Sequence, residues 1–88
     1  MFSGNVKYNM QFDFTYTLAT TETRVFNYLG KYETNNYYVM SYDDIIEFYR
    51  YLRDNFRDEY MTFGVNIDGK LKIDINLSPR TKSITFYE

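Results

Sequence analysis

The chain has 88 residues, a formal net charge of −2, and no histidine, cysteine or tryptophan. So short a chain can build only one hydrophobic core, and we therefore expect residues 1–88 to form a single domain. Without histidine and cysteine, Ser-His and Cys-His catalysis and zinc sites built on thiolate or imidazole are excluded. Aromatic residues make up 22% of the chain, half of its 44% hydrophobic content, so a few large side chains should supply most of the burial.

Residues 6–18, VKYNMQFDFTYTL, alternate strictly between apolar and polar side chains. Alternation with a period of two is typical of a half-buried strand. A strand of this length is expected to contain a bend or a bulge. The apolar positions are expected on one face: Val6, Tyr8, Met10, Phe12, Phe14, Tyr16 and Leu18.

Valine and aromatic residues favour two further strands, at 23–29 (TRVFNYL) and at 36–40 (NYYVM). A turn over residues 19–22 would then join the first two strands in a hairpin. The alternative for residues 21–29 is a short helix that begins at Thr20 or Thr21. The sequence leaves the choice between strand and helix open here.

Ser41 is expected to begin a helix that continues to about Arg57. Ser41 and Asp44 have the three-residue spacing of a capping box, and Asp43 also suits the positive end of a helix dipole. At 100° per residue, one apolar stripe should face the core, with Tyr42 at its margin. The stripe consists of Ile45, Phe48, Tyr49, Leu52 and Phe56.

The last third predicts a β-meander with a hairpin around NIDGK (66–70). A two-residue Asp-Gly turn would place Ile67 opposite Lys70 and mix apolar and charged residues on one face. We therefore predict a three-residue loop, Ile67-Asp68-Gly69, with Gly69 in a G1 bulge. The expected facing pairs are Val65 with Leu71, Phe63 with Ile73, and Met61 with Ile75. The segment Ser78-Pro79-Arg80-Thr81 should then turn the chain into a final strand that carries Ile84 and Phe86.

These elements define an α+β class: an antiparallel β-sheet of about five to six strands with a single α-helix packed on one face. The expected order is β-β-(β)-α-β-β-β.

Most of the eleven tyrosines are expected to fill the core, since Tyr8, Tyr16 and Tyr49 lie on apolar faces. Tyr51 differs, because it should point toward the polar face of the helix, among acidic residues. An exposed tyrosine within a charged rim is a typical anchor for a protein partner. We therefore predict a partner-binding surface on this helix face, formed by Glu47, Tyr51, Asp54 and Asp58. The alternative is a solvated face laced by pairs such as Arg50–Asp54.

Two other kinds of site are weaker in this sequence. Lys70, Lys72, Arg80 and Lys82 gather around the C-terminal hairpin, but the chain as a whole is acidic, which argues against direct nucleic-acid binding. Asp43-Asp44 and Asp58-Glu59 could in principle bind Mg²⁺. Adjacent acids at the ends of a helix more often cap it. We therefore expect no catalytic residues, no metal site and no cofactor.

In size and general character, the chain resembles two groups of small cytosolic binders. One group is the phage-encoded anti-CRISPR and other anti-defence proteins, and the other is the bacterial toxin-immunity proteins. The likeness covers the whole chain in general character and matches no specific residue, so it carries over no site. It implies a stoichiometric inhibitor that occupies the functional surface of its partner.

We therefore expect a small non-enzymatic protein-binding inhibitor, similar to anti-CRISPR proteins, that blocks a nucleic-acid-handling enzyme or complex. The expected location is the cytoplasm, or the host cytosol for a phage protein. No apolar run could span a membrane, and Met1-Phe2-Ser3-Gly4 lacks the basic start of a secretory signal. The alternatives are a toxin-immunity protein, a module that self-associates through a sheet edge as a homodimer, and a single-stranded nucleic-acid binder.

Overall fold

Six strands and two helices make up the chain in the computed structural model, which describes residues 4–87. The six strands form one sheet in the order β2-β3-β1-β4-β5-β6, and each neighbouring pair is antiparallel. The fold is therefore α+β with an antiparallel sheet, as the sequence predicts, but it has a second helix. Met1–Ser3, on which the expectation of no secretory signal partly rests, lie outside the described residues. The elements in chain order are β1 (Val6–Asp13), α1 (Ala19–Leu29), β2 (Glu33–Thr34), β3 (Tyr37–Met40), α2 (Tyr42–Asn55), β4 (Met61–Ile67), β5 (Lys70–Leu77) and β6 (Lys82–Phe86).

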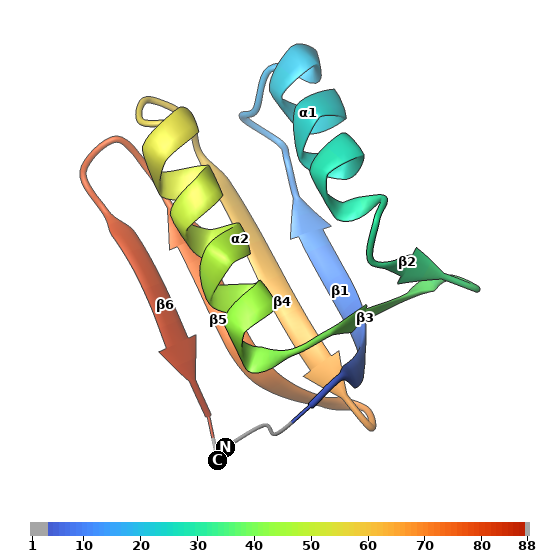
Figure 1. Ribbon diagram of the computed structural model, residues 1–88. Coiled ribbons are helices and arrows are strands. Elements are labelled where there is room, and N and C mark those ends of the chain that lie inside the picture. The colour runs from blue at the N-terminus through green and yellow to red at the C-terminus, as the bar shows by residue number, and fades with distance from the viewer. Residues whose placement is uncertain (1–3, 88) are drawn as a thin grey trace.

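The two helices lie over the same face of the sheet, with α2 across β4 and β5 and α1 beside β1 (Figure 1). Alternate residues of the strands point toward the helices, since Met10 pairs with Val65, which pairs in turn with Ile73. The core between the layers consists of Tyr8, Val25, Leu29, Tyr38, Met40, Ile45, Phe48, Leu52, Phe56, Met61, Phe63, Val65, Ile73, Ile75 and Leu77. The other face of the sheet carries the polar residues of the alternation.

Helix α1 corrects the expected strand at 23–29, and the alternative of a short helix is right. Thr21, Val25 and Leu29 are its buried residues, and their spacing of four places them on one face of a helix. Phe26 adds edge-on ring contacts to Phe12 of β1 and to Phe14 just after it, at 5.1 and 5.5 Å. Packing of this face therefore outweighs the β propensity of the threonine, valine and aromatic residues.

Helix α2 begins as the sequence predicts. The side chain of Ser41 accepts a hydrogen bond from the backbone N–H of Asp44 at 3.2 Å, and the carboxylate of Asp44 accepts one from the backbone N–H of Ser41 at 2.8 Å. This reciprocal pair is a capping box. Ile45, Phe48 and Leu52 of the predicted stripe are fully buried. The helix ends at Asn55, two residues before the expected end.

Strand β1 is shorter than expected, because it ends at Asp13. The side chain of Asp13 accepts hydrogen bonds from both the backbone N–H and the hydroxyl of Thr15, and the backbone N–H of Thr17 bonds to the carbonyl of Phe14. These turns bend the chain away from the sheet. Tyr16 and Leu18 consequently leave the apolar face and are 80% and 66% exposed, which contradicts their predicted place in the core.

The β4–β5 hairpin turns at Asp68-Gly69, where both residues have positive φ, 52° and 78°. This pattern is typical of a two-residue type I′ turn. Ile67 pairs with Lys70, which is the register that our sequence analysis rejects. The predicted three-residue loop is therefore wrong.

A bulge in β5 explains how the hairpin keeps its apolar face. Asn66 pairs with Leu71, but the next residue, Val65, pairs with Ile73, so Lys72 is the extra residue. From Val65 on, each residue pairs two positions further along β5 than expected: Phe63 faces Ile75, and Met61 faces Leu77. On sequence grounds, the Asp-Gly turn is rejected because it would mix apolar and charged residues on one face. In the structure, that mixing occurs only at the end of the hairpin, next to the turn.

Two further turns follow their sequence signals. Asn35 and Asn36 both have positive φ, 47° and 69°, and connect β2 to β3. Ser78 and Thr81 exchange backbone hydrogen bonds of 2.8 and 3.3 Å around the predicted turn that leads into β6.

Candidate partner-binding site

The predicted surface on α2 is only partly assembled as expected. Glu47, Asp54 and Asp58 are exposed, as a solvated acidic face requires. Asp54 forms an ion pair with the adjacent Arg53, at 3.0 Å, in place of the expected i,i+4 pair with Arg50. Exposed pairs of this kind contribute little stability.

Tyr51, the predicted anchor of that surface, packs within the fold. Its ring stacks on Tyr28 of α1, with 4.3 Å between centroids and 17° between planes, and meets the ring of Phe56 edge-on at 5.6 Å. Tyr51 is half-buried against the core. The expectation of an exposed Tyr51 is therefore wrong, because α1 covers the side of α2 from which Tyr51 projects. The role of this helix face in binding stays a prediction.

Two other tyrosines are presented to solvent instead. Tyr16 follows β1 and is 80% exposed, and Tyr60 precedes β4 and is 54% exposed. Their rings face each other edge-on, with centroids 6.4 Å apart and an interplanar angle of 70°. A pair of exposed aromatic rings in contact, at the end of a sheet, is the kind of feature that binding surfaces use as an anchor.

The loops that carry these two tyrosines are tied together by side chains. The hydroxyl of Thr17 donates to the backbone carbonyl of Tyr60 at 2.5 Å. Glu59 accepts the backbone N–H of Leu18 at 2.9 Å through one carboxylate oxygen, and the hydroxyl of Thr21 through the other. Each tyrosine is thus adjacent in sequence to a residue that anchors it to the other loop.

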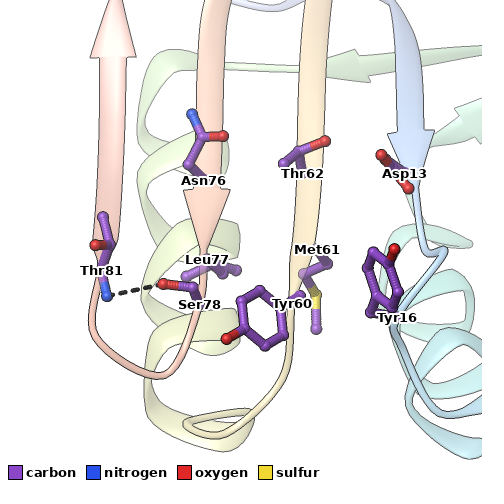
Figure 2. A pocket seen from close by; sticks show the side chains of 9 residues that line it. All are labelled: Asp13, Tyr16, Tyr60, Met61, Thr62, Asn76, Leu77, Ser78 and Thr81. Carbon is purple, nitrogen blue, oxygen red and sulfur yellow. Dashed lines mark hydrogen bonds between the residues drawn. The ribbon is translucent and has the colours of Figure 1, made fainter.

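A hollow of about 330 Å³ lies beside the tyrosine pair (Figure 2). Asp13, Thr62 and Asn76 form a row across three neighbouring strands, since Asp13 pairs with Thr62 and Thr62 with Asn76. These three residues lie on the sheet face away from the helices. The hollow is lined by Asp13, Tyr16, Tyr60, Met61, Thr62, Asn76, Leu77, Ser78 and Thr81. A hollow that combines tyrosine rings with a row of polar side chains can bind a partner side chain and orient it.

Another hollow, of about 500 Å³, lies on Tyr16, Tyr60 and Asp58. Asp58 is therefore part of the predicted helix surface and also lies beside the tyrosine pair. The charged residues that line the two hollows are Asp13 and Asp58, and both are acidic. Thr15 donates two hydrogen bonds to Asp13, and both lower the pKa of Asp13 below its ordinary value. The bond from the Thr15 hydroxyl has the larger effect, and the bond from its backbone N–H has the smaller one. The site is thus negatively charged at neutral pH.

Sequence reasoning missed this site because it extended β1 to residue 18. The available signal was Asp13-Phe14-Thr15, in which an aspartate two residues before a threonine can close a local turn. The ties through Thr17 and Glu59 join segments about forty residues apart. No local pattern in the sequence could indicate them.

One residue of the basic cluster and one residue of each acidic pair have structural partners. The ammonium of Lys82 donates to the carbonyls of Arg57, Ser78 and Pro79, at 2.8, 2.5 and 3.1 Å. Asp44 accepts a hydrogen bond in the capping box of α2, and Glu59 accepts one at the N-terminus of α1. Within residues 4–87, no group of three or more acidic side chains is placed to hold a metal ion. Neither helix in that range has the length and apolar character needed to cross a membrane.

Comparisons with protein-family models, with curated proteins and with solved structures found no match for this chain. The fold and the tyrosine site therefore define it as a small α+β protein with a polar open sheet face and an exposed aromatic pair.

Proposed function

We propose that this chain is a non-enzymatic inhibitor that binds a protein partner through Tyr16 and Tyr60 and blocks the functional surface of a nucleic-acid-handling enzyme. The observation that carries this proposal is the exposed tyrosine pair, with rings 6.4 Å apart, on two loops joined by hydrogen bonds. Tyrosine is enriched among the residues that dominate binding energy at protein interfaces.

The ties between the loops support a role in binding because they reduce the entropy lost on association. A side chain that is already held in place loses less freedom when a partner covers it. Tyr16 and Tyr60 contribute little to the stability of the fold itself, since each residue is more than half exposed. A partner that covers both rings would benefit from this fixed position of the two loops.

The charge of the chain supports a basic partner surface. The net charge is −2, and Asp58 adjoins the tyrosine pair while Glu47 and Asp54 extend the acidic surface along α2. Enzymes that handle nucleic acids carry lysine and arginine along the path of the phosphates. An acidic binder would be steered to that path and would compete with the nucleic acid for it.

The proposal is tested with the purified chain immobilised as bait in nuclease-treated extracts of candidate host cells, and partners are identified by mass spectrometry. We expect a nucleic-acid-binding enzyme, whose purified activity falls to zero at one equivalent of the chain per active site. Nuclease treatment ensures that bridging nucleic acid does not mimic direct binding. Capture only of proteins that do not handle nucleic acids, or an enzyme that stays fully active with excess chain, would contradict the proposal. Capture of a toxin nuclease would point to the immunity variant of the same function.

Self-association is the second candidate, because β6 forms one edge of the sheet with five residues while β2 at the other edge has two. An unpaired edge strand of this length can pair with a second copy of itself. Size-exclusion chromatography with light scattering distinguishes the two functions. A monomer of 10.7 kDa favours the inhibitor, and a stable dimer favours the self-associating module.

A further inference from the structure

The wall formed by Tyr16 and Tyr60 is shared by the two hollows. One hollow also contains the row of polar residues that begins at Asp13, and the other contains Asp58. Both tyrosines line both hollows, so each ring shares one hollow with Asp13 and the other with Asp58. Aromatic faces and carboxylates in one site are complementary to a planar cation.

We propose that this wall recognises an arginine side chain of the partner protein, with the guanidinium packed on Tyr16 or Tyr60 and hydrogen-bonded to Asp13 or Asp58. This inference rests on the proposed function and names the chemical group that the partner contributes. A guanidinium is flat, stacks on aromatic rings and presents five N–H donors to carboxylate oxygens. A lysine ammonium has neither the planar face nor the fork of donors.

Electrostatics distinguishes this occupant from the nearest alternatives. A phosphate or a nucleic-acid backbone would be repelled by Asp13 and Asp58, and the residues that line the two hollows include no lysine or arginine to compensate. Both hydrogen bonds from Thr15 end on Oδ1 of Asp13, and they help to keep the carboxylate ionised. The negative charge of Asp13, which would pair with an arginine, is therefore held in position by Thr15.

The protein uses the same contact elsewhere on its own surface. The guanidinium of Arg24 lies over the ring of Phe56 at 4.7 Å, and that of Arg53 lies 5.9 Å from the centroid of Tyr49. Within residues 4–87, the recorded contacts between cations and rings involve Tyr28, Tyr32, Tyr37, Tyr49 and Phe56. Tyr16 and Tyr60 carry no cation from the described part of the chain, so their faces are accessible to one from a partner.

The test uses two blocked pentapeptides, acetyl-Gly-Gly-Arg-Gly-Gly-amide and the same peptide with citrulline. Citrulline has nearly the shape of arginine but no charge, so it is the matched control. Each peptide is titrated into the ¹⁵N-labelled chain and followed by two-dimensional NMR. We expect saturable shifts at the amides of Tyr16, Tyr60 and Asp58 with the arginine peptide, and at least about tenfold weaker binding of the citrulline peptide. Equal affinities, or shifts that map elsewhere, would overturn the inference.

Variants separate this inference from the proposed function. Tyr16→Ala and Asp58→Asn should each weaken the arginine peptide severalfold, with unchanged dispersion of the remaining NMR signals, because both side chains are exposed. If the arginine peptide does not bind while Tyr16→Ala still weakens the whole partner, the arginine inference fails and the proposed function stands. If partner binding is independent of Tyr16 and Tyr60, the proposed function fails. The comparison of the two peptides on the unmodified chain decides the inference even if a variant does not fold.

Discussion

One carboxylate oxygen of Glu59 accepts the backbone N–H of Leu18 at 2.9 Å, across 41 residues of sequence. Leu18 is the N-cap residue of α1, and a leucine side chain cannot cap a helix. Glu59, from the loop after α2, instead accepts the N–H of this N-cap residue, and its other oxygen accepts the hydroxyl of the buried Thr21. The negative charge also lies at the positive end of the α1 dipole. One residue thus starts α1 and fixes the loops that carry the tyrosine pair.

Replacing Glu59 with alanine should lower the free energy of unfolding by about 1–2 kcal/mol, because the backbone N–H of Leu18 and the buried hydroxyl of Thr21 both lose their acceptor. Urea denaturation followed by circular dichroism measures the change. The matched control is Asp58→Ala, which removes the adjacent exposed acid and should change the stability by less than about 0.5 kcal/mol. Equal effects of the two substitutions would mean that Glu59 acts only through surface charge.

The stacked rings of Tyr28 and Tyr51 should be energetically coupled. We expect a double-mutant cycle of Tyr28→Ala and Tyr51→Ala to give an interaction energy of about 0.5–1.5 kcal/mol, as for other stacked aromatic pairs. The four proteins of the cycle are compared by urea denaturation. Strict additivity would show that the 4.3 Å stacking contributes nothing to the association of α1 with α2.

The type I′ turn predicts how the β4–β5 hairpin responds to substitution. Gly69 has a φ of 78°, and a β-branched residue resists this region, so Gly69→Val should lower the free energy of unfolding by about 1–2 kcal/mol. Asp68→Asn is the control, because asparagine tolerates the φ of 52° at that position. Thermal unfolding that is the same for Gly69→Val and the unmodified chain would argue against this turn.

Tyr8 predicts a loss of stability in alkali. Its burial, together with the negative charge of Asp44, raises the pKa of Tyr8 from 10.0 to about 12. The folded state therefore holds the phenolic proton more tightly than the unfolded state does. The resulting contribution to stability is complete below pH 10 and is lost as the pH rises to about 12, with a magnitude of about 2–3 kcal/mol. Urea denaturation at several pH values should show a shallower decline for Tyr8→Phe, and parallel curves would contradict the assignment.

Much of the fold could be predicted from sequence because the signals are local. The capping box of Ser41 and Asp44, the stripe on α2 and the alternation in β4 are patterns within a few residues, and each is confirmed. The alternation in β5 holds from Ile73 on, but Leu71, before the bulge, is 44% exposed and leaves the apolar face. The errors arise where distant contacts decide. Helix α1 depends on Glu59 from another loop, and the register of the hairpin depends on a bulge at Lys72 that two neighbouring strands accommodate.

The candidate site was hidden by the same limitation. Tyr16 and Tyr51 exchange their expected environments, because β1 stops five residues early and the unexpected helix covers Tyr51. Of the four residues predicted for partner binding, Asp58 is the one that also lies beside the exposed tyrosine pair. Which aromatic residue is exposed depends on tertiary packing, and composition and periodicity do not determine it.

The most direct test of the account is the affinity for the partner of a chain that carries both Tyr16→Ala and Tyr60→Ala, measured by isothermal titration calorimetry. Tyr87→Ala is the matched control, because Tyr87 is also half-exposed, at 48%, but lies at the other end of β6 from the site. If the tyrosine pair is the anchor, the double variant should bind at least about thirtyfold more weakly, equivalent to about 2 kcal/mol, while the control binds as the unmodified chain does. A folded double variant with unchanged affinity would contradict the account.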